Sequence, residues 1–237
     1  MQVQAADIHV AAATNLRFVL PEVAAQFKQQ TGHHVAISFA ASGTLTTQIL
    51  HGAPFEVFLS ASPGYIERLV QAGKTENGVV DYAKAQLAFY AANHSTLKVE
   101  GGMQALKDAL SNDSLHKVVI ANPKHAPYGQ AAKIALQDAG IWNAILPHLL
   151  IAENASQALQ FTMSTVVDAG FVPYAHVIQP KIASEGRFFK LDETLQQQAV
   201  LIKGAAEPAK QFLDFLQTDR AGNIFTKHGF LVATKEH

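Results

Sequence analysis

The sequence of 237 residues contains no cysteine, which excludes disulfide bonds, thiol catalysis and thiolate metal sites. Charged residues are scarce at 16%, and the formal net charge is -1, so no basic surface for nucleic acid is expected. No uninterrupted apolar run reaches the roughly 18 residues needed to span a membrane. Hydrophobic residues make up 49% of the chain, which is enough to bury a sizeable core in one large or two small domains.

The start of the chain, Met1-Gln2-Val3-Gln4-Ala5-Ala6, lacks the apolar core of a signal peptide. We therefore expect a mature protein from which a leader has been removed. The absence of cysteine is compatible with an oxidising compartment but does not require one.

Short apolar runs alternate with stretches of helical apolar spacing along the chain. Strands are predicted at 8–12, 34–40, 57–60, 86–92, 117–121, 149–152, from 170 and near 199–202. Helices are predicted at 16–30, 44–51, 63–72, 103–110, 130–139, 158–168, 208–217 and 221–228, with Pro21 in a first turn or at a kink. This alternation indicates an α/β fold in which helices cover both faces of mainly parallel sheets.

Small or polar residues stand at four places where a strand ends and a helix begins. These are Thr14-Asn15, Ser42-Gly43-Thr44, Tyr128-Gly129 and Asn154-Ala155-Ser156. Ligands of open α/β sheets bind outside the carboxyl ends of the strands, and helix starts offer unpaired N–H groups and a partial positive charge. With Lys124 as the only nearby cation, the pattern favours an anion held by neutral donors. The same residue types are also ordinary helix N-caps, and the pattern alone leaves both interpretations open.

Longer motifs resemble the periplasmic molybdate-binding protein family, in order and spacing, from about Asp7 to Phe230. They are Ala11-Ala12-Ala13-Thr14-Asn15-Leu16, Phe39-Ala40-Ala41-Ser42-Gly43-Thr44-Leu45 with Gln48-Ile49, 52–61, 122–129 and Gly170-Phe171-Val172. The resemblance implies a type II periplasmic binding protein of two domains joined by a double crossover hinge. Each domain would be a mixed, mainly parallel sheet flanked by helices.

The resemblance also sets expectations for boundaries, partners and location. Residues 1–86 with 178–237 would form the first domain and 87–177 the second, with the ligand in the cleft between them. The expected ligand is a tetrahedral oxyanion, molybdate or tungstate, delivered to the transmembrane permease of an ABC transporter. We expect a periplasmic monomer that is not an enzyme, uses no cofactor, binds no nucleic acid and has no direct cation ligands.

The family's ligand positions carry over onto five residues of this sequence. Thr14 and Asn15 supply the first loop, Ser42 the second, and the backbone N–H groups of Tyr128 and Ala155 the third and fourth. Where one branch of the family places a tyrosine, this sequence has Pro173, which has neither N–H nor side-chain donor. Tyr174 is shifted by one residue, which would turn its side chain away along a strand. Secondary candidates are therefore Gly43, Pro173, Tyr174 and His125, the last expected mainly to shape its loop.

Three alternatives compete with this hypothesis. The same scaffold could bind another small anion or organic acid, which predicts an arginine near the mouth of the site. An α/β enzyme would need a histidine and a carboxylate within hydrogen-bond reach of Ser42, and Glu153 with Asp168 could be imagined as an acid/base pair. A metal site at His33-His34 is the third, although these residues are expected at a surface turn.

Overall fold

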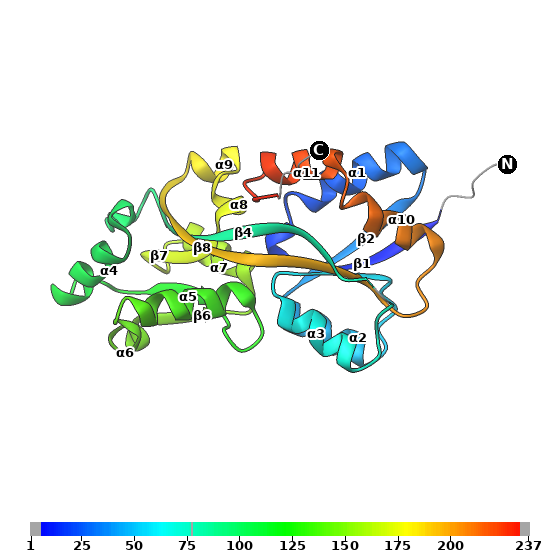
Figure 1. The fold of residues 1–237 in the computed structure, drawn as a ribbon. Helices are drawn as coiled ribbons and strands as arrows, with labels where there is room; N and C mark the ends of the chain where they lie inside the picture. The colour runs from blue at the N-terminus through cyan, green and yellow to red at the C-terminus, as the bar shows by residue number, and fades with distance from the viewer. Residues whose placement is uncertain (1–5, 77, 233–237) are drawn as a thin grey trace. The chain divides into compact units, whose positions relative to one another are not determined.

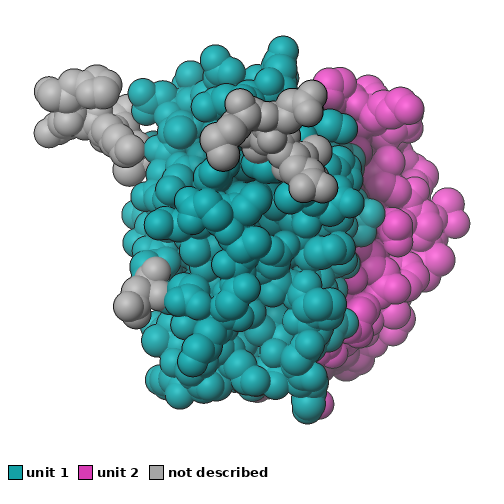
Figure 2. Space-filling view, turned by 90° about the vertical axis from the view of Figure 1, so that its right-hand side faces the viewer, with its two compact units in different colours: residues 1–85, 196–237 teal, residues 86–195 magenta. Residues whose placement is uncertain are grey.

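The computed structural model describes residues 6–76 and 78–232, so the leader prediction, which concerns the first few residues, falls largely outside the described chain. The contacts divide the chain into two compact units, shown in different colours in Figure 2. Unit 1 runs up to Ala85 and resumes at Gln196, and unit 2 is the continuous segment Gln86–Leu195.

The second crossing between the units differs from the predicted boundary at 177/178. Residues beyond this point bond into unit 2: Tyr90 Oη donates to the Ile182 carbonyl at 2.9 Å, and Gln86 Nε2 donates to the Leu191 carbonyl at 3.1 Å. The contacts therefore place the crossing at 195/196, whereas the first crossing lies within one residue of the prediction.

Burial raises the pKa of Tyr90 to about 12, with a further contribution from the charge of Glu185.

Unit 1 contains β1, β2 and β3 with parts of β4 and β8, and four of these strands stand in the order β2-β1-β3-β8. β1 pairs in parallel with β2 and β3, and β3 pairs antiparallel with β8. Its elements are β1 (Asp7–Ala13), η1 (Thr14–Leu16), α1 (Leu20–Thr31), β2 (His34–Ala40), α2 (Ser42–Leu50), β3 (Val57–Ser60), α3 (Pro63–Gln71), the start of β4 (Val80–Ala92), the end of β8 (Gly186–Leu201), α10 (Glu207–Phe215) and α11 (Asp219–Lys227).

Helices cover both faces of the unit 1 strands. α2 and α3 lie on one side, and α1, α10 and α11 on the other (Figure 1). A buried cluster that includes Leu45, Phe58 and Leu69 fills the first side. On the other, Phe27 packs its ring 5.2 Å from the ring of Phe212, centroid to centroid. The strands are thus held from both faces, as the alternation of elements predicts.

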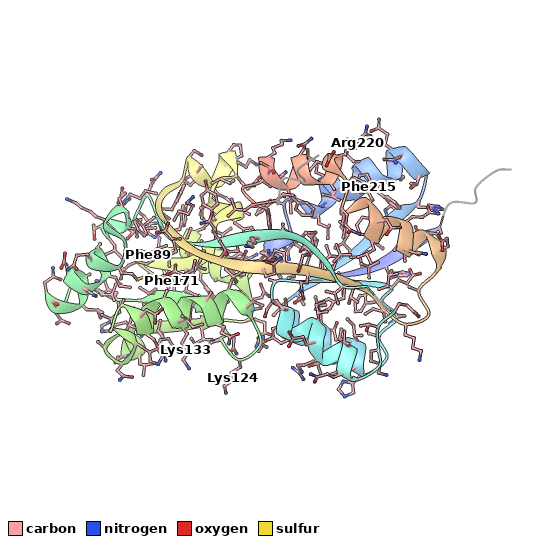
Figure 3. The ribbon with its side chains drawn as sticks, viewed as in Figure 1. Phe89, Lys124, Lys133, Phe171, Phe215 and Arg220 are labelled. Carbon is pink, nitrogen blue, oxygen red and sulfur yellow. The ribbon has the colours of Figure 1, made fainter. Side chains whose placement is uncertain are left out.

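Unit 2 contains β5, β6 and β7 with the other parts of β4 and β8, and four of these strands stand in the order β4-β7-β5-β6. β5 pairs in parallel with β6 and β7, and β7 pairs antiparallel with β4. Phe89 and Phe171, from β4 and β7, stack with ring centroids 4.8 Å apart (Figure 3). The other elements are η2 (Val99–Gly101), α4 (Gly102–Ser111), β5 (Val118–Ala121), α5 (Pro127–Asp138), α6 (Trp142–Ile145), η3 (Leu146–His148), β6 (Leu149–Ala152), α7 (Ala155–Met163), β7 (Ala169–Pro173), α8 (Tyr174–Val177) and α9 (Pro180–Ala183).

The architecture is therefore the predicted one: each unit holds a mixed, mainly parallel set of strands flanked by helices. β4 and β8 each run through both units, since the crossings at 85/86 and 195/196 fall inside them. Across the described ranges, no helix combines the length and the apolar character that crossing a membrane requires.

The bounds of α1 and α7 have causes in the local sequence. Pro21 is the second residue of α1, where its missing N–H costs nothing, and Gly32 ends that helix in the left-handed region with φ 82°. α7 begins at Ala155 rather than at the predicted 158, because the Asn154 side chain accepts a hydrogen bond from the Gln157 N–H at 3.0 Å.

Candidate anion-binding site

Thr14 and Ser42 follow neighbouring parallel strands at the same carboxyl edge of unit 1. β1 and β2 are in register to their last residues, Ala13 opposite Ala40. Thr14 is the first residue of η1 and Ser42 the first residue of α2. Both are buried, at 3% and 0% relative exposure. The structure thus places both hydroxyl residues at one carboxyl edge of unit 1.

The Ser42 hydroxyl is anchored to the end of a third strand. Its Oγ accepts a hydrogen bond from the backbone N–H of Ala61, one residue beyond β3, at 3.2 Å. A serine hydroxyl that accepts a bond keeps its own proton to donate. This partner is a backbone group, whereas the enzyme hypothesis needs a histidine at Ser42. Gly43, predicted in a turn before the helix, is instead a buried residue of the first turn of α2.

Asn15, next to Thr14, pairs with a residue that the sequence did not single out. Its Nδ2 donates to Oε1 of Gln197 at 2.9 Å, and both residues are buried, at 1% and 0% exposure. Gln197 lies near the end of β8, in the run Gln196-Gln197-Gln198. Three consecutive amides beside an apolar strand end were the only sequence signal for it.

Tyr128 and Ala155 stand in the same relation within unit 2. β5 and β6 are parallel and in register to Ala121 and Ala152, and the Asn122 N–H donates to the Ala152 carbonyl at 2.7 Å. Tyr128 is the second residue of α5 and Ala155 the first of α7, and both are buried. Unit 2 therefore brings its two predicted backbone donors to one carboxyl edge.

Gly129 explains how α5 reaches that edge. A Cβ at this position would lie 2.0 Å from the Ala121 carbonyl oxygen and 2.9 Å from the carbonyl carbon of Asn122. Only glycine permits such an approach of helix to strand. The sequence placed 122–129 in a loop, but α5 already starts at Pro127, so the first turn of the helix sits directly on the end of β5.

His125 links the third and fourth loops within unit 2. Its Nε2 lies 3.7 Å from Oε1 of Glu153, and its backbone N–H donates to the Asn122 carbonyl at 3.3 Å. That His125 shapes its loop stays a prediction. Glu153 also contributes its N–H to the side chain of Gln157, while Asp168 accepts from the N–H groups of His116 and Lys117. The two carboxylates are thus engaged in different places.

The helix starts show which of the four loops has an ordinary N-cap. The N-cap residues of η1, α2 and α5 are Ala13, Ala41 and Ala126, all extended in backbone and without a side-chain cap bond. Only Asn154, before α7, caps a helix among the four loops. Thr14 and Ser42 lie one residue inside their helices, where a hydroxyl does not serve as N-cap. Capping therefore does not explain these two hydroxyl residues.

Pro173 and Tyr174 lie at the end of β7, which runs parallel to β5 and so ends at the same carboxyl edge of unit 2. Pro173 is the buried last residue of β7, opposite Leu87. Tyr174 was predicted to continue the strand, but it begins α8 instead. Its ring packs edge-on against Phe188 with centroids 5.8 Å apart, and Lys190 Nζ lies 5.3 Å from its centroid. The aromatic packing, rather than strand alternation, gives the direction of this side chain.

The cations near the loops need one correction. Lys124 is exposed and points away from its loop (Figure 3). Arg17 follows the first loop by two residues, and its guanidinium carbon lies 5.4 Å from the Phe39 ring centroid. The prediction that Lys124 is the only nearby cation is therefore wrong. Arg17 is exposed and stacks on an aromatic ring, a common arrangement for a guanidinium.

The histidines predicted at a surface turn are divided. His33 is buried at 3% exposure, and its Nδ1 accepts from the Ala6 N–H at 3.2 Å while its ring stacks on Phe27. His34 is exposed and pairs with Asp7 at 3.1 Å. In the portion of the chain that the structure describes, no group of three or more His, Cys, Asp or Glu side chains is arranged to hold a metal ion.

Comparisons with known proteins show to which family this chain is similar. A family model described as bacterial extracellular solute-binding protein matches residues 8–231. The molybdate-binding protein of Rhodobacter capsulatus is 36% identical over 231 residues, which are 96% of this chain and 89% of the relative. That of Azotobacter vinelandii is 33% identical over 234 residues, which are 96% of this chain and 90% of the relative.

Solved structures give the same result. The periplasmic molybdate-binding protein of Azotobacter vinelandii matches with a TM-score of 0.87 and 31% identity, covering 96% of this chain and all of that one. The sulfate-binding protein of Mycobacterium tuberculosis matches with a TM-score of 0.75 at 16% identity, over 97% of this chain and 88% of that one, which shows the shared fold alone.

Proposed function

The chain belongs to the bacterial extracellular solute-binding proteins, and we propose that it binds a tetrahedral oxyanion, molybdate or tungstate, for delivery to an ABC importer. Relatives named for molybdate binding cover nearly the whole chain, and a further relative is named as an ABC transporter substrate-binding lipoprotein. The family to which the chain belongs is one of transport proteins rather than of enzymes.

The observation that carries the proposal is the pairing of buried donors with helix starts, of which only α7 has a side-chain cap. In unit 1, Thr14 and Ser42 present hydroxyls at one carboxyl edge. In unit 2, the first turns of α5 and α7 begin at another. We propose that Thr14, Asn15 and Ser42 hold one side of the anion, and that the N–H groups of Tyr128 and Ala155 hold the other when the two units close around it.

Neutral donors suffice for tight binding of a dianion. A hydrogen bond to a charged partner contributes about 1.5–3 kcal/mol, so about six would contribute roughly 9–18 kcal/mol before the costs of closure and lost freedom. Nanomolar affinity requires about -12 kcal/mol net. Selectivity would follow from size, because sulfate is smaller than molybdate and would leave donors stretched. Tungstate and molybdate are nearly equal in size, and the site is proposed to accept both.

Titration calorimetry with molybdate, tungstate, sulfate, phosphate and a small dicarboxylate tests this function. We expect submicromolar dissociation constants for the first two and far weaker binding of the others. A preference for the dicarboxylate would favour the organic-acid alternative and would give Arg17 a role. Failure of both molybdate and tungstate to bind below the micromolar range contradicts the proposal.

Two further properties belong to the same proposal. A monomeric protein in the periplasm suits a carrier that must present its ligand to a membrane permease, and no cofactor is needed for binding. Sedimentation analysis should give a mass near the 25.5 kDa of one chain. Solution scattering with and without molybdate should show a more compact particle in the bound state, as hinged binders do.

A further inference from the structure

The contact between Asn15 and Gln197 spans a gap in the strands of unit 1. β3 lies between β1 and β8 and ends at Ser60, which is opposite Gln198. Neighbouring strands are about 4.8 Å apart, so β1 and β8 are separated by about 10 Å. Beyond the end of β3 two long polar side chains can meet, and Nδ2 of Asn15 there donates to Oε1 of Gln197 at 2.9 Å.

The chemistry of a carboxamide makes this contact directional. Its two ends have nearly the same shape, but the nitrogen carries two donors and the oxygen only accepts. An Asn15 that turned its oxygen toward a dianion would repel it, whereas the nitrogen end attracts it. Both residues are buried, where water does not compensate a wrong orientation.

We propose that Gln197 is a positioning residue for oxyanion binding. Its Oε1 accepts one N–H of Asn15, so the nitrogen end of Asn15, rather than the oxygen end, is held in this direction at the carboxyl edge. This inference rests on the proposed oxyanion function and adds a residue that does not itself touch the ligand. The hydroxyl of Ser42 is anchored by Ala61 in the same way, so two of the donors in unit 1 have a partner behind them.

The test replaces Gln197 by a side chain of similar size that lacks the amide oxygen that accepts the Asn15 N–H. Gln197→Leu is expected to weaken molybdate binding about tenfold to hundredfold in calorimetry, the range for one hydrogen bond to a charged group. Gln198→Leu is the matched control, because this neighbouring glutamine points to the other face and donates to Asp81 at 2.8 Å. Its affinity for molybdate should match that of the unmodified protein. If Gln197→Leu does not fold, Gln197→Met keeps the side-chain length and carries the same expectation.

A double-substitution cycle separates positioning from a structural role. Asn15→Ala combined with Gln197→Leu should bind no more weakly than Asn15→Ala alone, because Gln197 acts through Asn15. Two results would overturn the positioning role and leave the oxyanion function intact. One is a double variant in which the affinity losses of the two single variants multiply. The other is a Gln197→Leu variant with a lowered melting temperature and unchanged molybdate affinity. An unmodified protein that binds neither molybdate nor tungstate would overturn the function and this role with it.

Discussion

The hydroxyl of Ser42 accepts the backbone N–H of Ala61 at 3.2 Å, which joins the start of α2 to the end of β3. This bond gives Ser42 two tasks. It satisfies a buried backbone donor, and it fixes the direction in which the serine proton can point. Binding and stability are therefore expected to respond together at this residue.

Removing either hydroxyl should weaken the oxyanion. For Thr14→Ala and Ser42→Ala we expect losses of roughly 1.5–3 kcal/mol in the binding free energy of molybdate, measured by calorimetry. Ser42→Ala should also lower the free energy of unfolding by about 1–3 kcal/mol, because the Ala61 N–H loses its buried acceptor. Denaturant titration without ligand measures this second effect. Unchanged affinity in both variants would remove these hydroxyls from the site.

A serine at the N-cap of α2 should stabilise the protein and harm binding. Ala41→Ser offers a hydroxyl to the first-turn N–H groups and is expected to raise the free energy of unfolding by about 0.5–2 kcal/mol. The same hydroxyl competes with the anion, so molybdate affinity should fall. Ala206→Ser is the matched control, since Ala206 is an exposed alanine at the N-cap of α10, also without a cap bond. It should stabilise without altering affinity; equal affinities in both variants would argue against α2 as a ligand.

Gly129 should be intolerant of any side chain. A methyl group there would meet the Ala121 carbonyl oxygen at 2.0 Å, so Gly129→Ala must displace the first turn of α5. We expect a loss of stability of several kcal/mol, comparable to overpacking, together with weaker molybdate binding. Gly222→Ala in α11 is the control, because its methyl would meet only Val232 at 3.4 Å. A thermal melt of the two variants should separate them clearly, and similar melting temperatures would disprove the close approach.

Glu22 should give unit 1 an acid-sensitive contact between α1 and α11. Hydrogen bonds from His228 and Lys227, each at 2.8 Å, hold the pKa of Glu22 below its ordinary value of 4.5. A lowered folded-state pKa stabilises the fold above the unfolded value and loses that contribution as the pH falls through it. The difference in melting temperature between the unmodified protein and Glu22→Gln should therefore be largest near neutral pH and shrink below pH 4.5. A difference that grows on acidification would contradict this assignment.

Arg17 should matter little for the bound state. Its exposed guanidinium stacks on Phe39, and exposed charges act mainly through screened, long-range attraction. For Arg17→Gln we expect a dissociation constant for molybdate within about threefold of the unmodified value at physiological salt, with a larger effect on the association rate at low salt. Stopped-flow binding at two salt concentrations measures both. A hundredfold loss of affinity would mean that the Arg17 guanidinium binds the anion directly.

The sequence predicted much of the architecture because most strands are short and buried. The predicted bounds of β2, β3 and β6 agree with the structure. The prediction missed the start of β4, residues 80–85. It also missed most of β8, where residues 186–198 are largely polar and half-exposed. Apolar periodicity is not visible in such a segment, and pairing with distant residues decides its conformation.

The candidate site was predicted at the level of loops but not of contacts. Four loops could be named because small polar residues follow strands, and the carboxyl edges bring them together in pairs within each unit. Gln197 and Ala61 could not be found in this way, because Ala61 acts through its backbone and Gln197 lies 182 positions from its partner Asn15. Arg17 lies two residues beyond the first loop, outside the pattern of small polar residues.

Unit 2 is one uninterrupted stretch of chain, whereas unit 1 is made from both ends. The pairing of Val57 with Leu201 in β3 and β8 must wait until the ribosome or translocon has released the later part of the chain. Folding should therefore be vectorial: unit 2 becomes compact while unit 1 still lacks its C-terminal part. The slow step would be the pairing of β8 with β3, because the two strands are far apart in the sequence.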